Sequence, residues 1–258
     1  MISLVIPTLN EVDNIEPLLS RIAQCRPIPD EIIFVDDRST DGTRERLRCE
    51  AVELIERDHP SFGLAGAVLA GARVAKGEWL VVMDADLSHP PERIGDLLQP
   101  LFDGRADIVI GSRYVKGGST PGWPLWRKII SRVAAALAYP LTGVHDSLGG
   151  FFAMPTRLLL ETAPDATGFK IAFEVMVQGG KNLRVLELPI VFCNRTRGTS
   201  KMRLGVALLF ACRWVAAMTR SLFQRESAAG STASARFIRQ SSNPNPIKSS
   251  KVAHNALP

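Results

Sequence analysis

Two aspartates separated by one residue follow an apolar run about a third of the way along the chain. Asp84 and Asp86 come directly after residues 79–83, five large apolar residues that predict a strand buried on both faces. Side chains two residues apart on an extended backbone point the same way, so both carboxylates would leave the strand on one face. Adjacent carboxylates repel each other unless a cation lies between them, and ligands of open α/β sheets bind where strands end. The pair predicts a Mg²⁺ or Mn²⁺ site shared with substrate phosphates, or alternatively a solvated turn in which Asp86 caps the next helix.

Polar residues also follow the two strands predicted nearest the N-terminus. The first strand ends in Pro7-Thr8-Leu9-Asn10-Glu11 and the second in Asp36-Asp37. Backbone donors and carboxylates at these ends can bind a ribose or a base, although each motif alone also fits an ordinary helix N-terminus. A nicotinamide-dependent enzyme is not expected, because such an enzyme requires G-x-G-x-x-G after the first strand and this sequence lacks it there.

Alternating strand and helix patterns would position these groups. Strands are predicted at 2–6, 31–35, 52–55, 79–83 and 107–110, with helices at 11–24, 44–48, 64–75 and 90–102. This rhythm predicts an α/β fold with a mostly parallel central sheet and helices on both faces. Beyond residue 112 the rhythm breaks: we expect a loop over 116–126, a helix over 127–138, and strands at 149–153 and 185–192.

The composition is that of a globular enzyme. Of 258 residues, 46% are hydrophobic and 22% charged, and most of the formal charge of +5 lies in residues 226–258. A nucleic-acid partner is not expected, because a basic stripe with interleaved aromatic residues is missing from the rest of the sequence. The four cysteines are scattered without a Cys-x-x-Cys pair, which is typical of reduced thiols in the cytoplasm, and no signal peptide is expected before the first strand.

The C-terminal quarter divides into two further segments. We expect a catalytic domain over 1–202, an amphipathic helix over 203–225 and a disordered basic tail over 226–258. Arg213 and Arg220 interrupt the apolar stretch, so it should not span a membrane. They are seven residues apart, about two helical turns, which favours a helix lying in a membrane surface or one docked on the sheet or on a partner. Residues 129–141 leave the same two options open.

The order of the motifs resembles that of family 2 glycosyltransferases, and within them the dolichol-phosphate mannose synthases. The resemblance covers about residues 1–205 and rests on residues 7–11, 35–37, 84–90, 111–114, 127–132, 149–152 and 195–201. It implies a nucleotide-sugar fold of the GT-A type, GDP-mannose as the donor and a polyprenyl (dolichyl) monophosphate as the acceptor. It also implies Mg²⁺ or Mn²⁺, inversion at the anomeric carbon, and a peripheral location on the cytoplasmic face of a membrane, with a small membrane partner subunit left open.

The resemblance assigns roles to individual residues. The guanosine would be surrounded by Pro7, Leu9, Glu11, Val35 and Asp37, and the ribose and diphosphate by Asp84, Ala85 and Asp86. Asp86 and Ser88 would ligate the metal, and Arg195 and Lys201 would close over the donor diphosphate. The acceptor phosphate would be held by Arg113, Arg127 and Ser131. Catalysis is assigned to Asp86, Arg113, Arg195 and Lys201, whereas Glu174 could equally orient other groups.

The chain departs from the family pattern in the donor pocket. Leu9 stands where relatives commonly have Tyr, Arg38-Ser39-Thr40 replaces a usual Asn or Gly followed by Ser-Pro, and Gly149-Gly150 replaces Ser-Gly. These departures bear on the nucleotide and the sugar, so transfer of glucose or another hexose from a UDP-sugar is one alternative. Two others are transfer to a different, hydroxyl acceptor such as a growing polysaccharide, and a non-catalytic subunit that binds a nucleotide sugar.

Overall fold

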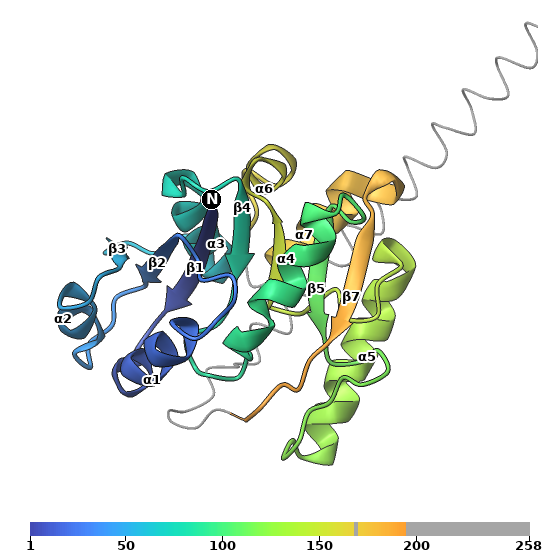
Figure 1. Cartoon of the computed structure of the whole chain (residues 1–258). Helices are drawn as coiled ribbons and strands as arrows, with labels where there is room; N and C mark the ends of the chain where they lie inside the picture. The colour runs from blue at the N-terminus through green and yellow to red at the C-terminus, as the bar shows by residue number, and fades with distance from the viewer. Residues whose placement is uncertain (168–169, 195–258) are drawn as a thin grey trace, which may run out of the picture. The chain divides into compact units, whose positions relative to one another are not determined.

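A seven-stranded sheet forms the centre of the computed structural model, which describes residues 1–167 and 170–194 (Figure 1). The strand order is β3-β2-β1-β4-β6-β5-β7. The strands are β1 (Ile2–Thr8), β2 (Glu31–Asp36), β3 (Glu53–Glu56), β4 (Trp79–Val82), β5 (Ile108–Ser112), β6 (Phe152–Pro155) and β7 (Val185–Pro189). β6 is antiparallel to β4 and β5, whereas the other neighbouring strands pair in parallel.

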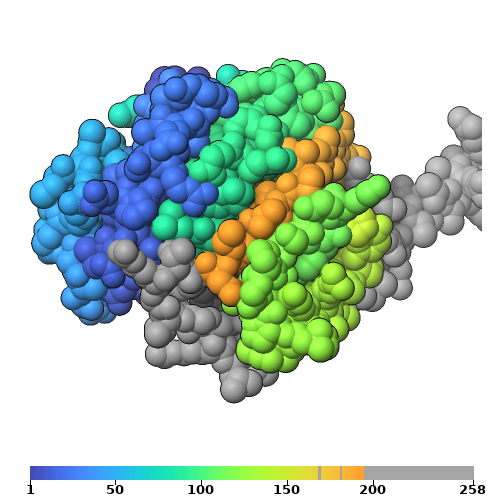
Figure 2. All heavy atoms as spheres, turned by 60° about the horizontal axis from the view of Figure 1, so that its bottom comes forward, coloured from blue at the N-terminus to red at the C-terminus, as the bar shows by residue number. Residues whose placement is uncertain are grey.

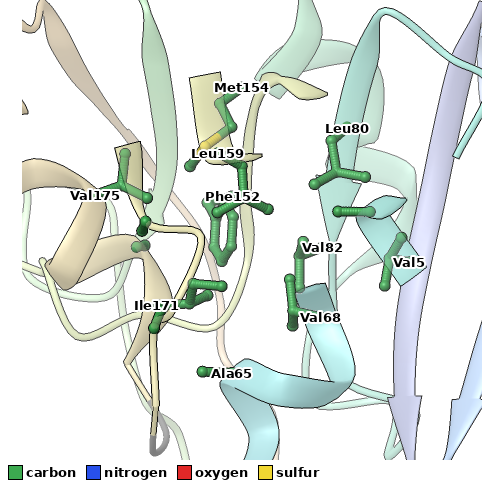
Figure 3. Close-up of a cluster of buried hydrophobic side chains, with 14 of the residues drawn as sticks. Val5, Ala65, Val68, Leu80, Val82, Phe152, Met154, Leu159, Ile171 and Val175 are labelled. Carbon is green, nitrogen blue, oxygen red and sulfur yellow. The ribbon is translucent and has the colours of Figure 1, made fainter. Parts of the chain in front are cut away.

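Helices cover both faces of this sheet. They are α1 (Val12–Ile22), α2 (Thr43–Arg48), α3 (Gly63–Val74), α4 (Ile94–Phe102), α5 (Leu125–Thr142), α6 (Thr156–Thr162) and α7 (Ile171–Gly179), with 3₁₀ turns at η1 (Pro91–Arg93) and η2 (Gly180–Asn182). One buried cluster joins the sheet to α3, α6 and α7, and a second joins it to α1, α2 and α4. Figure 3 shows part of the first, with Phe152 of β6 and Val82 of β4 among side chains of α3 and α7. Successive side chains along a strand point to opposite faces of the sheet, so they enter the two clusters alternately.

The predicted α/β class, with its mostly parallel sheet and helices on both faces, is confirmed. Several boundaries differ. The strand expected at 149–153 begins at Phe152, and the helix expected at 127–138 runs from Leu125 to Thr142 with Pro140 inside it. One proline removes one backbone donor, and here the helix continues past it. The segments 203–225 and 226–258 lie outside the described residues.

The register brings the predicted site strands to a common edge. Thr8, the last residue of β1, pairs with Asp36, the last residue of β2, and the backbone N–H of Asp37 donates to the carbonyl oxygen of Thr8 over 2.9 Å. β4 lies on the other side of β1, and the N–H of Met83 donates to the carbonyl of Val5 over 3.3 Å. β4 and β5 both run antiparallel to β6, so β5 ends at this edge as well.

Gly71 sets how closely α3 approaches the sheet. A Cβ added there would lie 2.6 Å and 3.0 Å from the two methyl carbons of Val5 on β1. We predict that Gly71→Ala lowers the free energy of unfolding by about 1–3 kcal/mol, because overpacking outweighs the better helix propensity of alanine. Urea unfolding would measure the change, and a variant as stable as the wild type would contradict this close contact.

Candidate active site

The loops after β1 and β2 are joined by hydrogen bonds. Ser39 Oγ accepts from the backbone N–H of Asn10 over 2.8 Å, and Asn10 Oδ1 accepts from the N–H of Thr40, also over 2.8 Å. The N–H of Glu11 donates to Thr43 Oγ1 over 2.9 Å. Ser39 and Thr40 are among the residues in which the chain departs from the family pattern, and here they connect the two loops. These hydrogen bonds join the loop that carries Leu9 and Glu11 to the loop that follows Val35 and Asp37, and all four residues are expected around a guanosine.

Asp36 and Asp37 are neighbours with different surroundings. Asp36 is fully buried and accepts hydrogen bonds from the N–H of Ser39 over 3.0 Å and from Nε of Arg44 over 2.5 Å, so its carboxylate holds the loop. The carboxylate of Asp37 lies 3.1 Å from Nη1 of Arg57. Burial raises the pKa of Asp37, while the charge of Arg57 opposes the rise. Of the two, Asp37 is the one whose side chain remains 18% exposed at the site edge.

Asp84 and Asp86 also differ in burial. Asp86 is 3% exposed and its Oδ1 accepts from the N–H of Ser88 over 3.0 Å, whereas the side chain of Asp84 is 34% exposed. Ala85 is buried between them, and Leu87 has a positive φ of 62° that turns the chain after the strand. Both carboxylates therefore follow β4, with Asp84 at the surface of the site.

His89 anchors this turn. Its Nδ1 accepts the backbone N–H of Asp84 over 3.0 Å, which requires the ring proton to be on Nε2 and the ring to be neutral. Burial lowers the pKa of His89, in agreement with a neutral ring. The ring stacks on Phe151 with centroids 5.3 Å apart and meets Phe192 edge-on at 5.2 Å. The side chain is a structural support for Asp84.

The donor set after β4 fits a small divalent cation. Asp84 and Asp86 supply carboxylate oxygens, and the buried Oγ of Ser88 has no hydrogen-bond partner among the described residues. Oxygen ligands of this kind suit Mg²⁺ and Mn²⁺. No group of three or more His, Cys, Asp or Glu side chains able to hold a metal occurs in residues 1–167 and 170–194. A cation here would therefore need further oxygens, and substrate phosphates are such ligands.

Arg113, the first residue after β5, is fixed by Asp146. Its backbone N–H and Nε each donate to Oδ2 over 2.8 Å, and Nη2 donates to Oδ1 over 2.7 Å. The Asp146 side chain is fully buried and that of Arg113 is 11% exposed. The guanidinium carbon also lies 5.6 Å and 5.5 Å from the ring centroids of Trp123 and Phe192. The side chain is a rigid cation with a single orientation.

A basic pocket lies beside Arg113. Its volume is about 180 Å³, and its lining residues are Arg113, Tyr114, Gly118, Ser119, Thr120, Trp123, Lys128 and Arg132. The guanidinium of Arg127 lies 3.9 Å from the centroid of Trp123, and Tyr114 Oη donates to Ser131 Oγ over 2.5 Å. Of the three predicted acceptor residues, Arg113 lines this pocket, whereas Arg127 and Ser131 contact two of its lining residues, Trp123 and Tyr114. Lys128 and Arg132 were not predicted, although their i,i+4 spacing on α5 was a signal that they share a face.

The segment after β7 connects the two halves of the site. The N–H of Cys193 donates to the carbonyl of Ser88 over 3.1 Å, and the N–H of Phe192 donates to the carbonyl of Ser119 over 2.9 Å. Figure 2 shows this segment, in orange, between the residues after β4 and those near α5. Arg195 and Lys201, expected to close over the donor, lie outside the described residues.

Lys170 is a further charged residue at the site that the sequence analysis did not select. Its Nζ donates to the carbonyl of Leu148 over 2.6 Å. Burial lowers its pKa to about 8, the charge of Arg113 lowers it as well, and the carboxylates of Asp84 and Asp146 raise it. Glu174, by contrast, lies one turn into α7. The available signal was the position of Lys170 four residues before Glu174, which the sequence analysis did consider.

Residues 3–174 match the family described as Glycosyl transferase family 2. The chain belongs to this family. It is 41% identical over 211 residues to a dolichol-phosphate mannosyltransferase of Pyrococcus furiosus. This alignment covers 78% of the present chain and 59% of the relative. The chain thus spans less than two thirds of that relative. It is 38% identical to a dolichol-phosphate mannosyltransferase of Saccharomyces cerevisiae, with 78% and 80% covered. It is 35% identical to a polyprenol monophosphomannose synthase of Mycolicibacterium smegmatis, with 77% and 79% covered.

Solved structures support the fold of the glycosyltransferase. Glucosyl-3-phosphoglycerate synthase of Mycobacterium tuberculosis, crystallised with Mn²⁺, UDP and glucosyl-3-phosphoglycerate, matches with a TM-score of 0.62. The match covers 84% of this chain and 78% of that one, at 22% sequence identity. The expected GT-A type fold is confirmed. Within the residues described, none of the helices has the length and apolar character needed to cross a membrane.

The ion pair between Arg113 and Asp146 yields a stability prediction. Asp146→Asn should lower the free energy of unfolding by about 3–5 kcal/mol, because it leaves a buried guanidinium without its counter-charge. The control is Asp107→Asn, which breaks the more exposed pair with Arg184 and should cost less than about 1 kcal/mol. Denaturant unfolding of both variants provides the comparison. Equal losses of unfolding free energy in the two variants would show that the buried pair contributes no more to stability than the exposed pair.

Proposed function

We propose that this glycosyltransferase transfers mannose from GDP-mannose to a polyprenyl monophosphate, with Mg²⁺ or Mn²⁺ and with inversion at the anomeric carbon. The observation that carries the proposal is the basic pocket lined by Arg113, Lys128 and Arg132, whose Arg113 interacts electrostatically with Asp84 after β4. The names of the relatives from Pyrococcus, Saccharomyces and Mycolicibacterium support the sugar and the acceptor.

The donor would lie across the ends of β1, β2 and β4. Pro7, Leu9, Glu11, Val35 and Asp37 would surround the guanosine, and Asp84, Ala85 and Asp86 the ribose and diphosphate. A cation bound by Asp86 and Ser88 would neutralise charge that grows on the leaving diphosphate. Arg195 and Lys201 would add positive charge to the same group. The partial exposure of Asp84 and the burial of Asp86 are consistent with this division.

The acceptor phosphate would enter the basic pocket. Arg113, Arg127 and Ser131 would hold it, joined by Lys128 and Arg132. The indole Nε1 of Trp123 supports an anionic occupant, because this buried donor has no hydrogen-bond partner among the described residues. A phosphate monoester has a second pKa of about 6, so it is largely dianionic at neutral pH and attacks without a general base. A hydroxyl acceptor would need such a base instead.

An apolar face of α5 supports contact with a membrane surface. Leu125, Trp126 and Ile130 are 73%, 60% and 56% exposed, and Ile129, Val133 and Leu137 are exposed as well. The helix contains three basic residues and no acidic one. Apolar side chains beside cations suit the interface of an anionic bilayer, where a polyprenyl phosphate would be found. We therefore infer a peripheral position on the cytoplasmic face of a membrane.

Transfer itself is tested with purified full-length protein, Mg²⁺, a polyprenyl phosphate and radiolabelled GDP-mannose, with UDP-glucose in parallel. Label from GDP-mannose should enter the organic phase, and Asp86→Ala should reduce it at least about 100-fold by removing charge stabilisation of the leaving group. The control is Asp96→Ala, a more exposed carboxylate on α4.

Each outcome of this assay separates one alternative. Label from UDP-glucose alone would replace the proposed sugar and nucleotide while keeping the reaction type. Absence of lipid-linked label from both donors, with detergent and membranes supplied, would reject the proposal in favour of another acceptor or a binding subunit.

The membrane surface is tested by sedimentation with vesicles containing phosphatidylglycerol. Replacing Trp126 and Ile130 together by serine should weaken vesicle binding at least about tenfold, because two large apolar side chains would no longer enter the interface. Ile28→Ser, which removes a 49% exposed apolar residue outside α5, is the control. Undiminished binding of the double variant would rule out this face.

A further inference from the structure

Lys170 precedes α7 and has no role in the mechanism described so far. Lys170 is partly buried, and its ammonium group donates one hydrogen bond to the neutral backbone carbonyl of Leu148. An ammonium group has three donors, so this bond uses a third of its capacity. Removing a lysine charge from water is costly. A partly buried lysine beside the proposed site therefore differs from a surface lysine, which keeps its hydration.

Residues 146–150 determine where this charge lies. The carboxylate of Asp146 holds Arg113, and the carbonyl of Leu148 accepts from Lys170. Gly150 packs on the donor side, because a Cβ added there would lie 3.6 Å from both carboxylate oxygens of Asp84. A turn closed by the bond from Gly149 N–H to the Asp146 carbonyl, 3.0 Å long, joins these positions. Lys170 is therefore tied to the short segment between the acceptor arginine and the donor carboxylate.

The electrostatic surroundings agree with that position. The pKa of Lys170 is lowered to about 8 by burial and by Arg113, and is raised by Asp84 and by Asp146. At neutral pH the group is still mainly protonated. Asp146 already compensates Arg113 through two hydrogen bonds from the guanidinium. Lys170 thus brings a second positive charge close to Arg113, within electrostatic reach of Asp84.

We propose that Lys170 binds the acceptor phosphate at the point where it approaches the donor sugar. The proposal rests on the proposed function. In the transfer, a phosphate oxygen forms a bond to the anomeric carbon while the bond to the leaving diphosphate breaks, and the diphosphate departs with the electron pair. Lys170 neither gains nor loses a proton. Its charge offsets the repulsion between a dianionic nucleophile and the carboxylates of Asp84 and Asp86.

A structural role predicts a different pattern of effects. If Lys170 only tethers Leu148, its loss should lower stability and disturb donor and acceptor alike, and arginine at this position should not restore acceptor binding selectively. If Lys170 binds the phosphate, its neutral replacement should weaken the acceptor far more than the donor. A cation of another shape should then restore part of the loss.

The experiment compares Lys170→Met and Lys170→Arg in the full chain. Binding of farnesyl phosphate in detergent and of GDP-mannose with Mg²⁺ is measured by calorimetry, and thermal melting reports folding. The matched control is Lys76→Met, a lysine just before β4, at the opposite end of the strand from Asp84. We expect Lys170→Met to weaken farnesyl phosphate at least about tenfold, with GDP-mannose changed less than twofold and with partial recovery in Lys170→Arg.

The outcomes separate this proposal from the proposed function. Equal binding of farnesyl phosphate by wild type and Lys170→Met would overturn the role of Lys170 and leave the transferase intact. Weakened binding of GDP-mannose instead would also overturn it, in favour of the donor diphosphate. A wild type that binds farnesyl phosphate through Lys170 but transfers no sugar would reject the proposed function alone. A wild type that does not bind farnesyl phosphate would reject both.

Discussion

The buried ion pair between Arg113 and Asp146 is the interaction on which the proposed acceptor half of the site depends. It joins the end of β5 to the segment after α5, and the backbone N–H of Asp146 extends the connection to Glu187 of β7 over 2.9 Å. Desolvating two charges is costly, and a bidentate pair with an added backbone donor recovers much of that cost. Once this pair forms, the aromatic rings of Trp123 and Phe192 have a fixed cation to pack around.

The proposed donor half also contains a buried ion pair, between Asp36 and Arg44, and adds contacts from backbone groups and short polar side chains. Asn10, Ser39 and Thr40 connect two loops without any charged group, and His89 orients Asp84 through a neutral ring nitrogen. The side chain of Asp84 is 34% exposed at the surface of the site. Both halves thus contain a buried ion pair, and the proposed donor half adds hydrogen bonds between its two loops. The residues after β7 connect the two through Ser88 and Ser119.

The sequence was sufficient to predict the fold class and the site edge, because both follow from local patterns. Apolar runs ending in polar residues at β1, β2 and β4 located the carboxyl ends directly. Asp146 could not be found in this way, since its importance comes from a contact with Arg113 across 33 residues of sequence. The antiparallel direction of β6 was equally hidden, because a four-residue apolar strand reads the same in either orientation.

The antiparallel strand β6 has a geometric consequence for the reaction. β4 and β5 are not hydrogen-bonded to each other, because β6 lies between them and pairs with both. Neighbouring strands are about 4.8 Å apart, so the ends that carry Asp84 and Arg113 begin roughly 10 Å from each other. That interval is set by the backbone ladder rather than by any side chain. Side-chain substitutions can therefore change the groups that line the site, while the interval between Asp84 and Arg113, which the two proposed substrates would bridge, stays constant across such variants.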